Sequence, residues 1–137
     1  MVYDRLVPAR LPINTVMDVI TARRTGFELA QTIGFPLPEA TKIAVVISEL
    51  GRNIVLYADG KGSVTLIPYG GEKKGIKIIA EDEGPGIKEL DLVLKGNYST
   101  SRGMGVGISG SKRLVDEFDI RTAVGVGTIV TAVKWLQ

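Results

Sequence analysis

The spacing of apolar residues changes from a helical repeat to a strand repeat near Gly60, and this change limits the folds open to the chain. Apolar side chains recur every three or four positions in residues 13–33 and again in residues 38–57, which predicts two amphipathic helices. Residues 64–69 and 75–80 instead have the composition and alternation of two strands joined by a short turn. Two helices are therefore expected to precede a hairpin.

The remaining segments extend this pattern into an α+β arrangement. Four of them are predicted to be an edge strand, a third helix and the two strands of a closing hairpin, at residues 2–8, 108–118, 119–123 and 128–136. Strands and helices neither alternate strictly nor segregate along the chain. We therefore expect a two-layer α+β sandwich, with helices on one face of a mixed, mostly antiparallel sheet. Residues 1–137 are expected to form a single domain.

One long stretch without clean periodicity separates the hairpin from the third helix. Residues 82–104 contain glycine, proline, serine, threonine and asparagine, with a short helical turn predicted at residues 88–94. Loops of this length inside a compact domain are usually functional.

The composition excludes several kinds of chemistry. The chain has no cysteine and no histidine, which rules out disulfides, zinc sites with thiolate or imidazole ligands, and a Ser-His-Asp triad. A net charge of +2 favours neither nucleic acid nor a membrane surface as a partner. The N-terminal segment lacks the features of a secretion signal, and no run of about 18 apolar residues occurs, so a cytoplasmic location is expected.

The first candidate motif is the pair Glu49 and Asn53 on the second predicted helix. Residues four apart project from the same helical face, and this face lies beside the apolar stripe. A carboxylate and a carboxamide one turn apart can hold Mg²⁺ or orient an attacking hydroxyl. An ordinary surface pair has the same spacing, and spacing alone favours that simpler interpretation.

The second motif is the acidic and glycine-containing turn at residues 81–87, directly after an apolar strand. Gly84 and Gly86 allow unusual backbone dihedrals, while Pro85 stiffens the turn. The carboxylate of Asp82 at a strand end is a good acceptor for an exocyclic amine. A plain Asp/Gly/Pro turn remains the alternative.

The third motif is a run of alternating glycines at residues 102–108, which leads into a helix. Exposed N–H groups at a helix start form an anion site, although a flexible hinge has the same composition. A dinucleotide fingerprint is rejected because no strand precedes the glycines, and a P-loop is rejected because Ser111 and Lys112 stand in reverse order.

Taken in order, the three motifs resemble the N-box, G1 box and G2 box of the GHKL superfamily, the Bergerat-type ATP-binding fold of gyrase, MutL and histidine kinases. The chain is similar in more detail to the RsbT-type switch kinases of bacterial stress signalling. The segments that carry this likeness are residues 48–53, 81–87, 98–101, 112–114, 116–118 and 134–136. The resemblance covers nearly the whole chain.

The resemblance implies a role for each matching residue. Asn53 would ligate Mg²⁺, Glu49 would act as general base, and Asp82 would accept the adenine amino group. Thr128 would support the adenine pocket through water, and Arg102 stands where related anti-sigma kinases carry a phosphate-contacting arginine. The remaining residues implied to bind ATP are Gly84, Gly86, Ile87, Gly103, Met104, Gly105, Val106 and Gly107.

The resemblance also implies a function. RsbT-type kinases use ATP and Mg²⁺ to phosphorylate serine or threonine of STAS-domain antagonist or scaffold proteins of the stressosome type, and once released they activate a PP2C-type phosphatase. Three alternatives remain open: an anti-sigma-factor kinase that binds sigma directly, a non-catalytic ATP-dependent binding module, and a histidine-kinase catalytic domain acting in trans. The sequence also leaves open whether the chain forms a homodimer.

Overall fold

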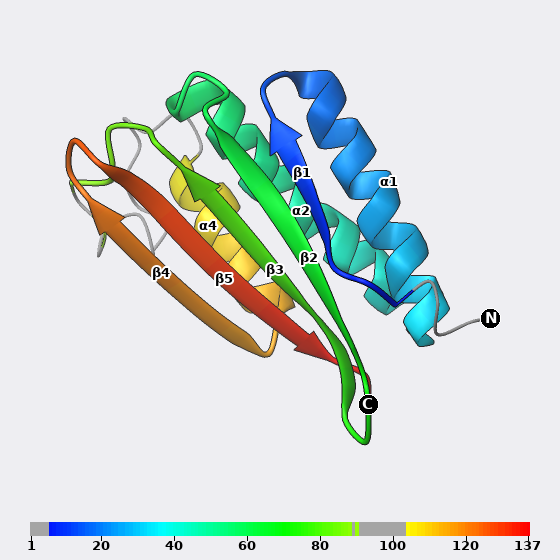
Figure 1. Cartoon of the computed structure of the whole chain (residues 1–137). Coiled ribbons are helices and arrows are strands. Elements are labelled where there is room, and N and C mark those ends of the chain that lie inside the picture. Colours follow the sequence, from blue (N-terminus) through cyan, green and yellow to red (C-terminus); the bar gives the residue numbers. More distant parts are fainter. Residues whose placement is uncertain (1–5, 89, 91–103) are drawn as a thin grey trace.

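The computed structural model describes residues 6–88, 90 and 104–137, which form two layers (Figure 1). The elements in chain order are β1 (Ala9–Ile13), α1 (Val16–Ile33), α2 (Leu37–Tyr57), β2 (Gly62–Gly70), β3 (Lys74–Asp82), α4 (Met104–Leu114), β4 (Glu117–Ala123) and β5 (Gly127–Trp135). The strands form one sheet in the order β1-β2-β3-β5-β4, and the three helices lie on one of its faces (Figure 1). The predicted α+β sandwich is confirmed.

The sheet differs from the prediction in one respect, because every pairing among the described strands is antiparallel rather than mixed. Strands β3 and β4 run in the same direction, so direct pairing between them would be parallel. Strand β5 lies between them and pairs with both, so each neighbour in the sheet runs the opposite way.

The first strand lies further along the chain than residues 2–8, where the sequence predicted it. Residues 6–8 precede β1, and residues 1–5 lie outside the part of the chain that the structure describes. Pairing with β2 sets the position of β1, since its register runs from Ala9 opposite Leu66 to Ile13 opposite Gly62. Pro12 is tolerated inside this strand because β1 is at the edge of the sheet.

The third predicted helix is also displaced, because α4 begins at Met104 and ends at Leu114 rather than spanning residues 108–118. Glu117 and Phe118 belong to β4, where they pair with residues 133 and 132 of β5. This pairing with β5 overrides the local helical pattern. The helical turn predicted at residues 88–94 falls largely outside the described residues.

The core lies between the sheet and the helices, and it holds α2 against the inner strands. Ile47, Leu50 and Ile54 of α2 are almost fully buried. Gly26 lies within an unbroken α1, and a Cβ there would overlap the Cδ1 of Ile47. Gly26 therefore allows α1 to approach α2 closely. No helix among the described residues is long and apolar enough to cross a membrane.

Candidate functional site

A polar row interrupts the apolar inner face of the sheet at one end. Ile78 and Ala80 of β3 are buried on the helix side, so Asp82, at the next alternate position, points to the same side. The strand register places Asp82 opposite Thr128 in β5 and Thr128 opposite Thr122 in β4. The row therefore crosses three neighbouring strands directly beside the core.

Asp82 holds its carboxyl group in a half-buried position in this row. Its Oδ1 accepts a hydrogen bond of 2.9 Å from the backbone N–H of Gly84. Burial raises the pKa of Asp82 above its ordinary value, while backbone hydrogen bonds from Gly84 and Thr128 oppose the rise. A carboxylate in this setting retains further acceptor capacity for an amine.

Thr122 ties the turn after β3 to the β4–β5 hairpin. The backbone N–H of Ile87 donates to Thr122 Oγ1 at 2.9 Å, and this oxygen lies 3.0 Å from Thr128 Oγ1. Gly86 has a φ of 77°, and a Cβ there would lie 2.5 Å from the carbonyl oxygen of Ala123. Only glycine therefore lets the turn approach the hairpin this closely. Thr122 was absent from the predicted site, because its place opposite Thr128 depends on the register of the β4–β5 hairpin.

Glu49 and Asn53 lie one turn apart on α2, and both are half-buried, as the sequence predicted. They border a groove of about 650 Å³ between α2 and α4. A Cβ at Gly107 would lie 2.8 Å from Glu49 Oε2, so α4 runs directly against this carboxylate. Arg52 Nη1 lies 3.5 Å from Glu49 Oε1 in a partly exposed ion pair. The structure thus brings a carboxylate, an amide and bare helix backbone together.

The polar row and the α2 pair border different cavities, since Asp82 and Thr128 line a second one of about 630 Å³. The two groups are joined at the C-terminal end of α2. A Cβ at Gly84 would lie 2.7 Å from Ala58 Cβ, which places the turn after Asp82 against this helix end. Ala58 follows Asn53 by about 7.5 Å along the helix axis. Segments distant in sequence therefore gather around the last turns of α2.

Part of the third predicted motif lies beyond these observations. Arg102 and Gly103 fall outside the residues that the structure describes. Met104, Gly105 and Val106 form the beginning of α4, with only their backbone described. The phosphate-binding roles of these residues stay predictions.

The donor atoms on α2 fit the Mg²⁺ that the resemblance implies. Mg²⁺ prefers oxygen ligands and is commonly held by one or two protein groups together with substrate phosphates and water. Asn53 offers an amide oxygen, and Glu49 offers a carboxylate one turn away. No cluster of three or more Asp, Glu, His or Cys suited to a metal occurs among the described residues. The donor set therefore matches an ion shared with a bound nucleotide.

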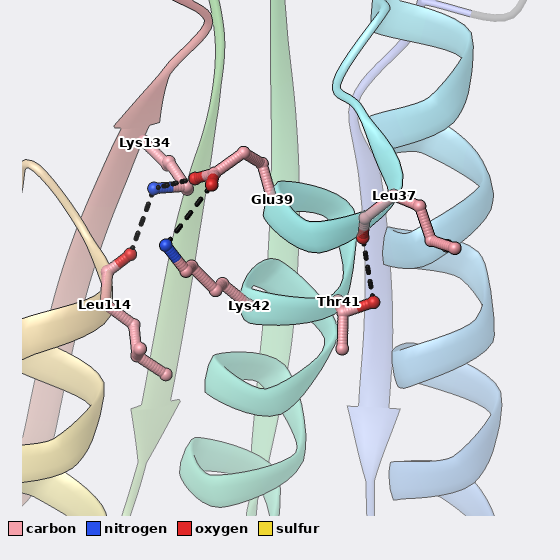
Figure 2. Close-up of polar contacts among 6 residues, drawn as sticks. All are labelled: Leu37, Glu39, Thr41, Lys42, Leu114 and Lys134. Atoms are coloured by element: carbon pink, nitrogen blue, oxygen red, sulfur yellow. Dashed lines mark hydrogen bonds and ion pairs between the residues drawn. The ribbon is translucent and has the colours of Figure 1, made fainter.

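Lys134, a buried lysine of β5, anchors both helices that border the groove. Figure 2 shows its Nζ between two elements, 2.9 Å from Glu39 Oε2 on α2 and 3.2 Å from the carbonyl oxygen of Leu114 at the end of α4. A cation at a helix C-terminus complements the helix dipole. The hydrogen bond from Lys134, with a second from Lys42, holds the pKa of Glu39 below its ordinary value.

Replacing Lys134 with methionine is expected to lower the free energy of unfolding by about 1–2 kcal/mol at pH 7, since a charged hydrogen bond and a partly exposed ion pair are lost. Urea denaturation measures the change. Because the pKa of Glu39 is lowered in the folded state, its share of this stability is present at neutral pH and is lost as the pH falls through that pKa. Lys42→Met is the control, because Lys42 pairs with Glu39 at the surface. Equal losses in the two variants would contradict the anchoring role of Lys134.

Comparison with known proteins identifies the family of this chain. The family model for the histidine kinase-, DNA gyrase B- and HSP90-like ATPases matches residues 39–137. The chain is 45% identical over 126 residues to the serine/threonine-protein kinase RsbT of Bacillus subtilis, which covers 91% of this chain and 94% of the relative. It is 32% identical over 108 residues to the anti-sigma F factor of Pasteuria penetrans, which covers 74% of this chain and 71% of that protein.

Two solved structures share the fold. The first, of the RsbU and RsbW domains of a Mycobacterium tuberculosis protein, has a TM-score of 0.66 and 19% identity over 93% of this chain and 32% of that chain. The second, the histidine kinase domain of a blue-light activated kinase from Erythrobacter litoralis, has a TM-score of 0.55 and 21% identity over 87% of this chain and 63% of that chain. With the family model spanning most of the chain and RsbT matching nearly all of it, the protein belongs to the histidine kinase-, DNA gyrase B- and HSP90-like ATPase family, in the branch that contains RsbT.

Proposed function

We propose that the protein is a Mg²⁺- and ATP-dependent protein serine/threonine kinase. The observation that carries this proposal is the position of Glu49, whose carboxylate lies one turn from Asn53 and directly beside Gly107 of α4. The relationship to RsbT, which is named as a serine/threonine-protein kinase, supports the same activity. A module that only binds nucleotide has no use for a general base at this position.

In this proposal the nucleotide binds with its adenine at the polar row and its phosphates at α2 and the beginning of α4. Asp82 accepts a hydrogen bond from the adenine amino group, supported by Thr128. The turn containing Gly84, Gly86 and Ile87 forms the wall of this pocket. Backbone N–H groups at the start of α4 bind phosphate, because the N-terminus of a helix attracts anions. Asn53 would hold a magnesium ion, which would supply positive charge to the phosphates.

Phosphoryl transfer then needs positioning and one proton acceptor. The oxygen of the acceptor hydroxyl forms a bond to the γ-phosphorus, while the bond from this phosphorus to the bridging oxygen breaks and ADP leaves. Glu49 accepts the hydroxyl proton and returns it to water. Its side chain is 33% exposed, which leaves the carboxylate within reach of a hydroxyl from a second protein.

The acceptor in this proposal is a STAS-domain antagonist or scaffold protein of a bacterial stress-signalling partner switch, and the released kinase activates a PP2C-type phosphatase. The RsbT-type resemblance supports this choice. Labelled ATP mixed with the kinase and a purified STAS-domain protein, followed by mass spectrometry of phosphosites, tests it directly. Acid-stable phosphate on serine or threonine is expected. Acid-labile phosphate would indicate a histidine-kinase activity in trans, and absence of label on protein would indicate a binding module.

A second candidate function follows from the match to the anti-sigma F factor of Pasteuria penetrans. In this alternative the protein is a kinase that also binds a sigma factor directly. A pull-down with a sigma factor in parallel with a PP2C-type phosphatase separates the two candidates. The higher identity to RsbT favours capture of the phosphatase.

The affinity for ATP is expected to depend on the ionisation of Asp82. Because burial raises the pKa of Asp82 above 3.8, its carboxylate should protonate, and ATP binding weaken, at a higher pH than for an ordinary aspartate. Asp82→Asn cannot ionise and should bind ATP about tenfold more weakly at neutral pH. Calorimetric titrations from neutral to acidic pH measure both proteins, and their difference cancels the titration of ATP itself.

The same shift fixes the sign of the effect on stability. A raised pKa in the folded state means that protonated Asp82 favours folding and ionised Asp82 opposes it. The stabilising contribution of the protonated form is therefore lost as the pH rises through that pKa. Asp82→Asn should therefore be at least as stable as the natural protein at neutral pH. Near-normal ATP affinity in this variant would refute the adenine-binding role of Asp82.

A further inference from the structure

The groove between α2 and α4 continues along both helices beyond Glu49 and Asn53. It is bordered by the apolar side chains of Val45, Leu56 and Leu114. Val45 and Leu56 are 36% and 58% exposed, so the residues that the structure describes leave this apolar strip uncovered. From residue 45 to residue 56 the α2 wall extends about 16 Å, the length of about five residues of extended chain.

Gly110 lies on the α4 wall of this groove, where it leaves the helix without a side chain. A Cβ at Gly110 would meet no atom of the described residues within 4 Å, and the backbone there does not have a positive φ. Glycine in the interior of a helix is less stable than alanine at the same position. Within the described residues, neither packing nor backbone conformation requires glycine at this position, and the bare backbone leaves room for a second molecule.

Two guanidinium groups stand on opposite walls of the groove. Arg52 on α2 has its side chain 56% exposed and pairs with Glu49 at 3.5 Å. Arg113 on α4 is exposed and has no ion-pair partner within the described part of the chain. An uncovered apolar strip between two arginines complements a segment that carries acidic side chains beside apolar ones.

We infer that this groove docks the acceptor segment of the protein substrate, an extended acidic segment that carries its serine or threonine to Glu49. The inference rests on the proposed kinase function. An acidic residue of the substrate pairs with Arg113, and another pairs with Arg52 and draws it away from Glu49. The freed carboxylate can then accept the proton of the hydroxyl. Binding of the acidic segment in the groove therefore also frees the carboxylate of Glu49 from Arg52.

The test uses the full chain and a STAS-domain protein in which the phosphosite has been mapped. Gly110→Leu places a side chain in the groove about one turn beyond Gly107, and Arg113→Glu reverses its charge. Each variant is expected to raise KM for the acceptor about tenfold or more, while kcat and the Kd for ATP stay within about twofold. The melting temperature of Gly110→Leu should equal or exceed that of the natural protein, because leucine is a better helix former. Arg24→Glu, an exposed arginine on α1, is the matched charge control.

A charge reversal on the acceptor completes the design. Replacing an acidic residue next to the phosphosite with lysine should raise the KM that the natural kinase has for the acceptor. The Arg113→Glu kinase should have a near-normal KM for this lysine variant. Unchanged KM in both kinase variants would refute the inference and leave the proposed function intact. A loss of ATP affinity would assign the groove to the nucleotide instead. A homodimer abolished by Gly110→Leu would assign it to a second copy of the chain. Absence of transfer by the natural protein would refute the proposed function, and this inference with it.

Discussion

Replacing Asn53 with alanine is expected to abolish binding of magnesium-ATP. Asn53 is the residue predicted to ligate the metal, and it lines the groove together with Glu49. Alanine has the highest helix propensity, so α2 should remain folded. Loss of the metal ligand should raise the Kd for ATP at least about 100-fold, equivalent to about 2.7 kcal/mol. Titration calorimetry with and without Mg²⁺ measures the change.

Two controls separate a metal role from a structural one. Thr41→Ala changes an exposed residue of the same helix, whose hydroxyl donates to the carbonyl oxygen of Leu37 (Figure 2), and it should leave ATP binding unchanged. Adenosine has no phosphates and should bind the natural protein and Asn53→Ala equally. ATP binding by Asn53→Ala that still strengthens with Mg²⁺ as in the natural protein would show that the metal is held elsewhere.

Replacing Glu49 with glutamine is expected to preserve ATP binding and remove phosphoryl transfer. Glutamine keeps the size of the side chain beside Gly107 but cannot accept the hydroxyl proton. A positioned general base contributes about 10²–10⁴-fold to a rate, and kcat should fall by a factor in this range. Single-turnover transfer to the acceptor protein, measured at saturating ATP, gives the loss in the chemical step.

The effect on folding should be small, because the ion pair that Glu49 makes with Arg52 is partly exposed and such pairs contribute about 0–1 kcal/mol. Glu28→Gln, on the exposed side of α1, controls for the loss of one negative charge. A normal kcat in Glu49→Gln would mean that the proton leaves by another route. A large loss of ATP affinity would indicate that Glu49 is a metal ligand rather than the general base.

Local patterns predicted much of the fold because they depend on periodicity within a single element. The apolar stripe of residues 38–57 predicted α2, and the helical spacing of Glu49 and Asn53 placed both on one face. Gly34 stands directly after the apolar repeat of residues 13–33, and it ends α1 with a left-handed φ of 118° and an N–H that bonds to the carbonyl oxygen of Ala30. These features need no knowledge of a distant partner.

The predicted bounds are wrong where pairing with a distant strand determines the secondary structure. Residues 115–118 continue a helical pattern, yet Phe118 pairs with Ala132 in the sheet and shortens α4. The first strand lies at Ala9–Ile13 because β2 is available there as a neighbour. Strand propensity depends on such neighbours more than helix propensity does, which is why strand ends are poorly defined by a single segment.

The amino-acid sequence by itself determined the types of its main elements, the chemical groups available and the motifs that indicated the family, since all of these are properties of short segments. Only the tertiary structure decided that Thr122 joins Asp82 and Thr128 in one row, that Gly107 lies against Glu49, and that Lys134 holds the ends of two helices. These are contacts between segments far apart in the chain. They depend on strand register and helix packing, which become defined only when the whole core assembles.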